Sequence, residues 1–448
     1  MRILSLGTNL GDSFNNLRQA LQLLQKSRKI APYRISPLYS SQALLPAYAP
    51  VAWNRSFLNL AVACETDLSP GEVLTVIKQI ERQMGREEGQ RWAPRIIDID
   101  ILAWDNCVIN QADLKIPHAE LLSRPFALWP LLDLWPNWQH PTAEFNDVLS
   151  NWGSRYSGEQ APCGTKQLPH RLEGSALVGI LNITPDSFSD GGRFITLPNA
   201  LAQAEKLVRE GAEVLDIGAE STRPHANPAV SPETEWALLH PVLVALKEQM
   251  KQWPFKPKLS IDTRHYRVAE QAMQLGIDWI NDVSGFVDPN MRALLAGSVV
   301  KCVVMHNLGI PPQKTNVMMS HGDICEQITN WAEQRFDQLL ADGVNAHQLI
   351  FDVGIGFGKT AQQSIFLLKN ICHFRRLHCP LLIGHSRKSF LNAITEKPFP
   401  ARDFETAMLS YQLAAQGVDF LRVHNVGLNA QAIRMSTQFT QSEEFATV

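Results

Sequence analysis

The sequence predicts two parts of different fold class: an α+β, ferredoxin-like N-terminal domain and a C-terminal α/β TIM barrel, the (β/α)8 fold. In residues 1–150 the apolar periodicities follow the order β-α-β-β-α-β. Residues 151–173 lose this periodicity and are rich in Gly, Pro, Ser and charge, which is typical of a linker. Residues 174–440 contain eight strand-like apolar runs, with helical patterns between most of them, in the length that a closed barrel needs.

The N-terminal elements follow from the two periodicities. Alternating or continuous apolar runs bounded by turn residues predict strands at Arg2–Gly7, Arg34–Ser40, Leu58–Glu65 and Ile96–Leu102. Apolar residues spaced by three and four predict amphipathic helices at Phe14–Gln25 and Gly71–Met84. This order favours an antiparallel sheet that is covered by helices.

The C-terminal part repeats a strand–helix unit. Short apolar runs predict strands at Ala176–Ile183, Glu213–Ala219, Leu259–Asp262, Trp279–Val283, Cys302–His306, Leu349–Val353, Pro380–Gly384 and Phe420–His424. Helical patterns between them cover Asn199–Glu210, Glu233–Gln252, Val268–Leu275 and Ile324–Ala341. An open, doubly wound sheet is the alternative to a barrel.

Polar residues gather near the C-terminal end of nearly every one of these runs. They are Asn182, Glu220 to Arg223, Asp262, Asn281 with Asp282, Met305 with His306, Asp352, Ser386 to Lys388, and Arg422 with His424. Any one of them could simply cap a helix. Because all strand ends of a barrel converge on one mouth, their agreement favours a barrel with an active site there.

Composition excludes several classes of protein. The chain of 448 residues has a net charge of −3 and only 19% charged residues, without a basic stripe, which argues against a nucleic-acid role. No apolar stretch reaches 18 residues, so we expect no membrane span. The seven cysteines include no C-x-x-C pair, and the thirteen histidines lack ligand spacing. The N-terminus shows no signal peptide, so we expect a reducing, cytoplasmic location.

Two aspartates interrupt the apolar run that ends the segment RWAPRIIDIDIL, residues 91–102. Asp98 and Asp100 alternate with Ile97, Ile99 and Ile101, so both carboxylates leave the same face of the strand, about 7 Å apart. Like charges on an apolar strand are unfavourable unless positive charge lies between them. Paired hard oxygen ligands suit Mg²⁺, which keeps several waters and takes substrate phosphates as further ligands.

Around this pair the sequence gathers Glu81, Arg86, Arg91, Trp92 and Arg95, and further along the chain His118 and Arg124. Arginine forks match phosphate oxygens, so the set predicts an ATP site that is not a P-loop. A surface network of ion pairs at a strand edge is the alternative. The glycine-rich DVGIGFGKT at 352–360 has the wrong spacing for a Walker A motif and is interpreted as a tight βα loop.

Five segments resemble 6-hydroxymethyl-7,8-dihydropterin pyrophosphokinase over nearly all of the first 150 residues. They are LGTNLGD at 6–12, FLNLAV at 57–62, IERQMGR at 80–86, RWAPRIIDIDIL at 91–102 and IPHAELLSRPFAL at 116–128. The resemblance implies transfer of the β,γ-pyrophosphoryl group of ATP to the hydroxymethyl oxygen of the pterin. It also implies two Mg²⁺ ions held by Asp98 and Asp100.

The same resemblance implies a role for each matching residue. ATP would be bound by Glu81, Arg86, Arg91, Trp92, Arg95, His118 and Arg124, with Arg86 and Arg95 counted as catalytic together with the two aspartates. The pterin would be bound by Ser41, Leu44, Phe57, Asn59 and Phe126, with Phe57 and Phe126 against its faces. Arg91 and Trp92 would lie on a loop that closes the site.

Eight further segments resemble dihydropteroate synthase over the whole predicted barrel. They are GILNITPDSFSDGG (179–192), GAESTRP (218–224), SIDT (260–263), WINDVSG (279–285), VMH (304–306), DVGIGFGK (352–359), GHSRKS (384–389) and RVH (422–424). The resemblance implies that 4-aminobenzoate is joined to the pterin pyrophosphate, with release of pyrophosphate. This chain departs from the family pattern at Ala219, Val353 and Ile355, and none of these changes removes a charge.

By resemblance, the barrel residues divide among three ligands and one Mg²⁺. The pterin would be bound by Asp262, Asn281, Met305, Asp352, Phe357, Gly384 and Lys388, of which Asp262, Asp352 and Lys388 are counted as catalytic. Aminobenzoate would be bound by Thr222, Pro224 and Ser389. Pyrophosphate would be bound by Asn182, Thr222, Arg223, Arg422 and His424, with Asn182 acting through the Mg²⁺. Loops 185–194 and 219–232 would close over the aminobenzoate.

Several alternatives remain open from the sequence. His306 and Arg387 could be structural or functional. One domain could be inactive and serve as a pterin-binding or assembly module, although the charged residues of both sites are present. A corrinoid or pteridine methyltransferase barrel shares the Asp and Asn pattern but needs no pyrophosphate-binding residues. The resemblance also raises a homodimer through the barrel as an expectation.

Overall fold

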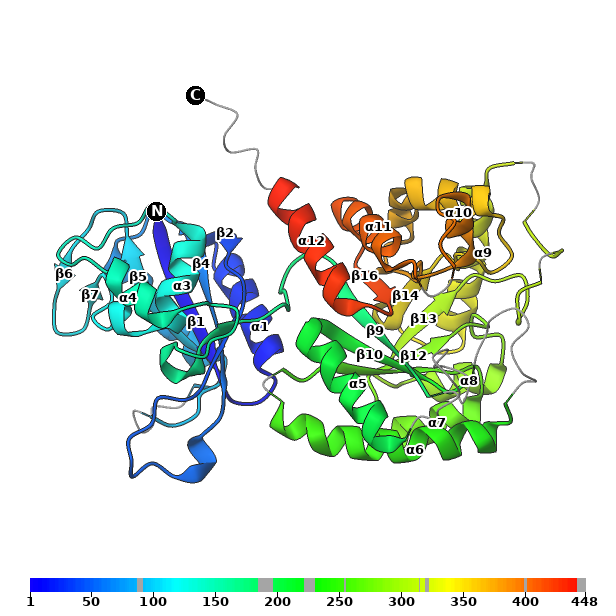
Figure 1. The fold of residues 1–448 in the computed structure, drawn as a ribbon, viewed down its shortest axis with the longest axis horizontal. Coiled ribbons are helices and arrows are strands. Elements are labelled where there is room, and N and C mark those ends of the chain that lie inside the picture. The colour runs from blue at the N-terminus through cyan, green and yellow to red at the C-terminus, as the bar shows by residue number, and fades with distance from the viewer. Residues whose placement is uncertain are drawn as a thin grey trace. The chain divides into compact units, whose positions relative to one another are not determined.

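The computed structural model describes residues 1–86, 92–183, 196–220, 230–253, 255–313, 315–318, 322–398 and 401–440. The chain divides into two compact units: Met1–Leu172 together with Trp253–Lys256, and the remainder from Glu173 onward. Figure 1 colours the described elements of both units from blue at the N-terminus to red at the last helix.

The first unit is an antiparallel sheet with helices packed against it (Figure 1). Its strand order is β5-β1-β4-β3-β8, and β2 pairs with β4. The strands are β1 Arg2–Thr8, β2 Ala31–Ile35, β3 Tyr39–Ser41, β4 Phe57–Glu65, β5 Asp98–Trp104, β6 Ile109–Asn110, β7 Lys115–Ile116 and β8 Lys166–Gln167. The helices are α1 Ser13–Lys26, α2 Pro70–Gln83, α3 Pro125–Leu134 and α4 Asn146–Trp152, with 3-10 turns η1 Val51–Trp53, η2 Leu121–Ser123 and η3 Pro162–Gly164.

The strand predicted at Arg34–Ser40 is divided into β2 and β3. Pro37 lies between them and has no N–H to donate to a neighbouring strand. The hydroxyl of Ser36 accepts a hydrogen bond from Ala61 N at 2.9 Å, so a side chain takes the place of a main-chain partner. The break lets Tyr39 and Ser41 pair with β4 in their own register.

Part of the predicted linker is folded onto the first unit. β8 pairs with β3, and the buried Tyr39 hydroxyl donates to Asp133 Oδ2 at 2.6 Å, while Arg155 forms an ion pair with the same carboxylate. The structure therefore extends the first unit to Leu172, beyond the boundary predicted at residue 150. A two-residue strand is too short to leave a periodicity in the sequence.

The second unit is a closed barrel of eight parallel strands in the order β10-β11-β12-β13-β14-β15-β16-β9, which confirms the predicted fold. The strands are β9 Ala176–Asn182, β10 Ala212–Gly218, β11 Lys258–Asp262, β12 Trp279–Asp282, β13 Lys301–Met305, β14 Leu349–Asp352, β15 Leu381–Ile383 and β16 Phe420–Val423. The helices are α5 Leu197–Glu210, α6 Pro232–Gln249, α7 Tyr266–Gln274, α8 Pro289–Leu295, α9 Ile324–Ala341, α10 Ala361–Lys369, α11 Asp403–Ala415 and α12 Val426–Thr440. The 3-10 turns are η4 Met250–Gln252, η5 Ala346–Gln348, η6 Ile371–Leu377 and η7 Ser389–Ala393.

The barrel interior is a packed apolar core. Val178, Val214, Trp279, Val303, Ile350 and Leu382, one from each of six strands, form a buried cluster. Strand register brings Gly218 beside Asp262, Asp262 beside Asn281, and Met305 beside Asp352. The polar strand ends therefore lie at the same end of the barrel, where a TIM barrel binds its ligands.

Local sequence explains where helices begin and end. Ser69 accepts from the N–H of Glu72, whose carboxylate accepts from Ser69 N, so a capping box starts α2. Asp323 is the N-cap of α9, and its carboxylate accepts from Cys325 N and Glu326 N. Gly211 ends α5 with φ of 119°, a conformation that favours glycine.

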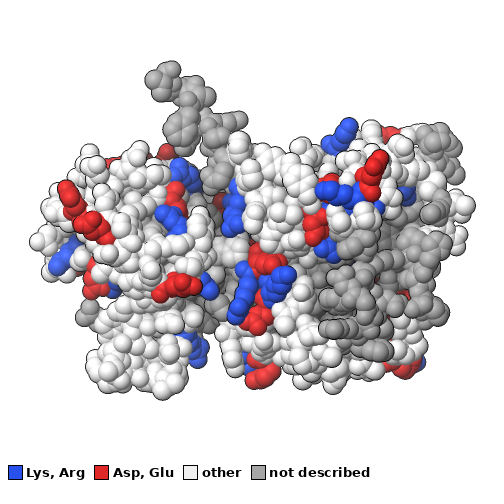
Figure 2. Space-filling view, viewed as in Figure 1, with Lys and Arg blue, Asp and Glu red and all other residues white. Residues whose placement is uncertain are grey.

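The surface charge and the hydropathy of the helices can be compared with what the composition predicts. Among the described residues, Figure 2 shows acidic and basic side chains interspersed on the face in view, with no extended patch of one sign. In the same part of the chain, no helix has the length and apolar character needed to span a membrane.

Candidate active sites

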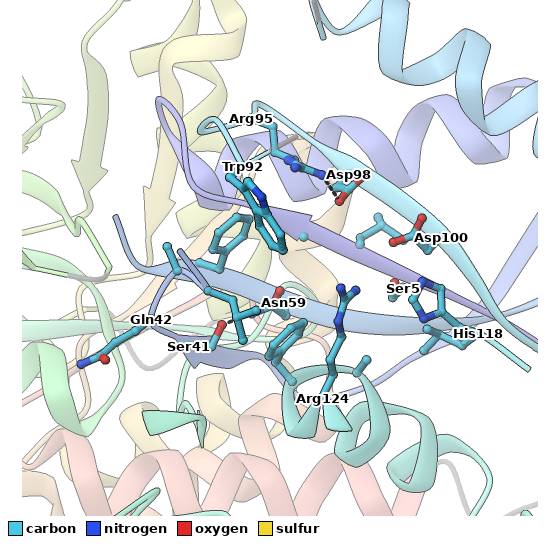
Figure 3. A pocket seen from close by; sticks show the side chains of 18 of the residues that line it. Ser5, Ser41, Gln42, Asn59, Trp92, Arg95, Asp98, Asp100, His118 and Arg124 are labelled. Carbon is cyan, nitrogen blue, oxygen red and sulfur yellow. Dashed lines mark hydrogen bonds and ion pairs between the residues drawn. The ribbon is translucent and has the colours of Figure 1, made fainter. Parts of the chain in front are cut away.

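The first site is a pocket on the face of the antiparallel sheet (Figure 3). On β1, which lies between β5 and β4, Gly7 pairs with Asp98 of β5 and with Asn59 of β4, and Ser5 pairs with Asp100. These small residues line the pocket, and a Cβ on Gly7 would lie 3.1 Å from the Asn59 side chain. The small side chain of Ser5 and the absence of one at Gly7 leave room for a ligand between the two aspartates and the Asn59 amide.

Asp98 and Asp100 both line the pocket, as the alternation of the strand predicts. Arg95 and Arg86 donate to the two oxygens of Asp98, at 2.5 Å and 2.6 Å. Although burial favours the neutral acid, these arginines hold the pKa of Asp98 below its usual range. Burial, together with the charge of Asp98, raises the pKa of Asp100. Both arginines thus neutralise Asp98, and among the described ion pairs Asp100 has no arginine contact.

Glu81 supports this arrangement from behind the strand. It is 2% exposed, accepts from Ile99 N at 2.8 Å and forms ion pairs with Arg86 and Lys78. Glu81 is thus directed at the protein rather than at the pocket. Its contacts orient Arg86 toward Asp98.

Aromatic and amide groups form the other end of the pocket. The Asn59 amide donates to Ser41 Oγ at 3.1 Å, and the side chains of Phe57, Trp92 and Phe126 line the same cavity. In Figure 3, Gln42 points away from the other labelled residues. The arrangement suits a flat ring that carries hydrogen-bonding edges.

His118 and Arg124 lie on the side of the pocket toward Asp100 (Figure 3). Burial lowers the pKa of His118, which Asp100 opposes and Arg124 reinforces. Arg124 is also paired with Glu120 and lies over the Phe126 ring at 5.9 Å. A neutral imidazole and a guanidinium can both donate to phosphate oxygens.

The predicted residues of the first site come together with few exceptions. Eleven line the pocket: Ser41, Leu44, Phe57, Asn59, Trp92, Arg95, Asp98, Asp100, His118, Arg124 and Phe126. Arg86 and Glu81 contact this group without lining the pocket. Arg91 lies outside the described residues. The sequence did not single out Ser5, Gly7 and Gln42, because small or neutral residues carry no charge signal.

The second site is a network of charges at the mouth of the barrel. Arg422 donates to Asp216 at 2.5 Å and to Asp262 at 2.6 Å, so it bridges two carboxylates. Burial raises the pKa of Asp262 to about 7, with Arg422 opposing and Asp216 adding to the shift. Asp216 and Asp262 raise the pKa of Arg422 in spite of burial, so the guanidinium stays charged.

Asp216 is a functional candidate that sequence reasoning missed. It is 1% exposed, accepts from Asn281 Nδ2 at 3.0 Å and from Ser260 Oγ at 2.5 Å, and so links three strands. The sequence pattern that indicated Asp98, a carboxylate within an apolar strand, is also present at Asp216 in the segment EVLDIGA.

Asp352 and Lys388 both lie beside Gly384, close enough for each to influence the charge of the other. Burial raises the pKa of Asp352 against the pull of Lys388, and burial lowers the pKa of Lys388 to about 8 against the pull of Asp352. Lys388 donates to Ile355 O and lies 4.9 Å from the centre of the Phe357 ring. A side chain at Gly384 would have its Cβ 3.6 Å from Asp352 and 3.7 Å from Lys388, so this glycine keeps the space open.

An apolar surface accompanies these charges. Val283, Met305 and Phe357 form a buried cluster, and Ile310 packs against it. Because Met305 is the strand neighbour of Asp352, a flat ligand bound by the carboxylate would meet this cluster with one face.

The GHSRKS loop is bound to the end of β16 by side chains. Ser386 Oγ lies 3.0 Å from His424 Nδ1, and Arg387 forms a bidentate pair with Asp403, which also accepts from Asn425. The guanidinium fork of Arg387 is therefore engaged within the protein, and its φ of 59° fits a residue held by its surroundings. This favours a structural role for Arg387.

Of the remaining residues predicted for the barrel site, only some lie within the described part of the chain. Asn182 ends β9 beside Gly218, and Ser389 starts the turn after Lys388. Thr222, Arg223 and Pro224 lie outside the described residues, as does the whole of 185–194 and most of 219–232. Among the described residues, no group of three or more His, Cys, Asp or Glu side chains is arranged to hold a metal by itself.

Comparisons with known proteins match both units of the chain. Residues 3–136 match the sequence model of the 7,8-dihydro-6-hydroxymethylpterin-pyrophosphokinase family, and residues 178–424 match that of the pterin binding enzymes. The folate synthesis bifunctional protein of Chlamydia caviae is 35% identical over 436 residues, which cover 96% of each chain.

Solved structures agree with this division. The dihydropteroate synthase of Anaplasma phagocytophilum is 36% identical with a TM-score of 0.54, covering 60% of this chain and 100% of its own. The HPPK-DHPS of Plasmodium falciparum covers 99% of this chain and 95% of its own with a TM-score of 0.53, and at 24% identity it supports the fold alone. The chain therefore belongs to the family of bifunctional folate synthesis proteins, with a hydroxymethyldihydropterin pyrophosphokinase and a dihydropteroate synthase on one polypeptide.

Proposed function

We propose that the pocket of the first unit and the charged network at the mouth of the barrel are the centres of these consecutive reactions. In the first, the hydroxymethyl oxygen of 6-hydroxymethyl-7,8-dihydropterin loses its proton and bonds to the β-phosphorus of ATP, and AMP leaves with the electron pair of the broken phosphorus–oxygen bond. In the second, the bond between the pterin methylene carbon and oxygen breaks, pyrophosphate leaves with the electron pair, and the amine of 4-aminobenzoate bonds to that carbon and loses a proton. The observation that carries the proposal is the pair of carboxylates beside arginines in a pocket whose other end is aromatic.

The residues of the first site fit a magnesium centre. Asp98 and Asp100 present hard oxygens from one strand face, and two carboxylates leave further positions of each ion to water and phosphate. We assign them to two Mg²⁺ ions, which when bound would neutralise charge on the phosphate oxygens. Pyrophosphoryl transfer otherwise depends on positioning, which the protein supplies.

Arg86 and Arg95 can donate either to Asp98 or to the phosphate oxygens of ATP. In the free protein both donate to Asp98, whose oxygens are thereby engaged. ATP offers phosphate oxygens to the same guanidinium groups, and release of Asp98 makes its oxygens available to a cation. Nucleotide and Mg²⁺ should therefore bind cooperatively, because each relieves the arginine–aspartate pairing that opposes the other.

The other end of the first pocket would hold the pterin. Phe57 and Phe126 are assigned to its faces, with Asn59 on its edge and Ser41 and Leu44 nearby. His118 and Arg124 are assigned to the triphosphate, together with Trp92 and the undescribed Arg91. Glu81 is assigned to support Arg86.

In the barrel, hydrogen-bonding groups converge where a pterin ring would lie. We assign the donor edge of the ring to Asp352, Asp262 and Asn281, its acceptors to Lys388, and its faces to Met305 and Phe357, with Gly384 giving access. The A. phagocytophilum synthase is described with bound 6-hydroxymethylpterin-monophosphate, which supports a pterin ligand for this barrel.

Pyrophosphate release would be assisted by cations at the mouth. We assign it to Arg422 and His424, with Asn182 acting through one Mg²⁺, and to Thr222 and Arg223. Charge drawn onto the leaving group favours cleavage of the carbon–oxygen bond before the weakly nucleophilic amine attacks. Aminobenzoate is assigned to Thr222, Pro224 and Ser389. We further propose a cytoplasmic location and a homodimer through the barrel.

Manganese binding measured by electron paramagnetic resonance tests the first centre. We expect Mn²⁺ alone to bind weakly and a nonhydrolysable ATP analogue to tighten its binding about tenfold or more, in line with typical coupling free energies. Asp98→Asn should abolish this tightening, whereas Asp113→Asn, a change at an exposed residue, should preserve it. Parental metal and nucleotide binding by Asp98→Asn would contradict the assignment.

A further inference from the structure

A buried lysine behind the barrel site has a set of contacts that the assignments above do not use. Lys359 is 7% exposed and ends the DVGIGFGK segment. Its Nζ lies 2.7 Å from His306 Nδ1, 3.0 Å from Phe357 O and 3.3 Å from His306 O. Three contacts match the three hydrogen-bonding directions of an amine head group.

These contacts are satisfied in either protonation state of the lysine. Burial, with the charge of Lys359, lowers the pKa of His306 to about 2, so the imidazole is neutral and Nδ1 can accept from an ammonium. Burial also lowers the pKa of Lys359 well below its usual value, although Asp352 opposes the shift. A neutral amine would donate to the two carbonyls and accept from the other imidazole tautomer.

The contacts join two elements of the pterin site. His306 directly follows β13 and donates its N–H to Asp352 O at 3.0 Å, while Phe357 lies within the loop that follows β14. Gly354 in that loop approaches His306 so closely that an added Cβ would lie 1.9 Å from the His306 carbonyl oxygen. Asp352 Oδ1 accepts from Gly354 N at 2.8 Å, so the position of the loop also sets the orientation of the Asp352 carboxylate.

Lys359 and Lys388 donate to different carbonyl oxygens of this loop. Lys388 donates to Ile355 O and contacts the Phe357 ring, whereas Lys359 donates to Phe357 O from within the protein. Lys388 is assigned to the ligand itself. Lys359, fully engaged by His306 and Phe357, has no atom left for a substrate.

We propose that Lys359 is a positioning residue of the synthase, which together with His306 fixes Phe357 and Asp352 in the geometry that binds the pterin. The proposal rests on the assignment of those two residues to the pterin. Since the reaction occurs at the methylene group, misplacing the ring's binding groups should weaken capture of the pterin substrate more than it slows turnover.

Steady-state condensation kinetics of the full chain test the proposal with Lys359→Met, which keeps length and removes the head group. We expect the KM for the pterin pyrophosphate to rise about tenfold or more, since small displacements in a site can cost up to about a hundredfold, and kcat to change less than about threefold. Lys369→Met, at an exposed position of α10, is the matched control and should leave both constants unchanged. Pyrophosphokinase activity of the same samples reports that the first unit is intact.

Two variants of His306 separate positioning from mere bulk. In His306→Asn the amide oxygen replaces Nδ1 as an acceptor, so the KM should stay within about threefold of the parent, whereas His306→Leu should behave like Lys359→Met. This pair remains informative if Lys359→Met does not fold. A parental KM in folded Lys359→Met, or equal damage in the two His306 variants, overturns the proposal. Failure of the pterin assignment itself would appear separately, as parental condensation by Asp352→Asn.

Discussion

Asp262 ends β11, Asp352 ends β14, and Asp216 lies two residues before the end of β10. Each of these carboxylates would be unfavourable there without a cation. Arg422 bridges Asp216 and Asp262, and Lys388 lowers the energy of the ionised Asp352. Burial nevertheless raises the pKa of Asp262 to about 7. Its protonation therefore falls within the range in which an enzyme assay can follow it.

This shift predicts a pH dependence of the condensation. Asp262 is assigned to accept a hydrogen bond from the pterin, which requires the carboxylate, and that form predominates above about pH 7. The value of kcat/KM for the pterin pyrophosphate should therefore fall as the pH drops below about 7, approaching tenfold per pH unit. The measurement is a pH series of condensation rates at low pterin concentration.

Asp262→Asn provides the comparison for that series. Its kcat/KM should be lower at pH 8 and should depend less steeply on pH between 6 and 8, because the titrating acceptor is absent. A parental pH profile in this variant would show that another group causes the acid limb.

Among the elements, the loop after β14 is the one most constrained by its neighbours. Gly354 and Gly358 both have positive φ, at 68° and 72°, and both approach the segment that follows β13. Glycine at these positions allows a positive φ, and its lack of a side chain also lets the two segments approach closely. These are separate requirements. The structure offers a way to distinguish them.

Gly354→Ala should impair the barrel through a clash rather than through backbone strain alone. Left-handed backbone costs an alanine about 1–2 kcal/mol, and that penalty is shared by Gly297→Ala, at φ of 71° with open space around its Cβ. In Gly354→Ala the Cβ also meets the His306 carbonyl, so we expect a free energy of unfolding lower by a further ~2 kcal/mol or more and a loss of condensation activity.

Denaturant unfolding of the two alanine variants, with condensation assays alongside, measures this difference. Equal stability of the two variants would mean that the loop can move away from His306. In that case the close packing between the loop and the end of β13 would not be required for function.

At the scale of the whole molecule, the sequence was sufficient for the fold class, and it singled out most charged residues that the structure brings together in the candidate sites. A barrel concentrates polar groups at its strand ends, so Asp262, Asn281 and Asp352 could be found without coordinates. The alternation of a strand likewise revealed Asp98 and Asp100. These signals survive because a charge within an apolar run stands out wherever it occurs.

Other features could not be predicted, for identifiable physical reasons. The pairing of β8 with β3 depends on a contact between distant segments, which leaves no periodicity. In the sequence, Lys359 is a lysine after a glycine-rich loop with no distinguishing pattern. Its proposed positioning role follows from three contacts that only the structure shows. Small residues such as Gly7 matter because of the space they leave, which sequence alone does not display.

The central claim is that two separate sites of this chain handle pyrophosphate, one attaching it to a pterin and one releasing it. A coupled assay of the full chain tests this most directly, with labelled ATP and hydroxymethyldihydropterin supplied first and aminobenzoate second. Asp98→Ala should abolish pyrophosphoryl transfer and still condense added pterin pyrophosphate, whereas Lys388→Ala should accumulate pterin pyrophosphate and form little dihydropteroate. Loss of both activities in either folded variant, or retention of both, would contradict the claim.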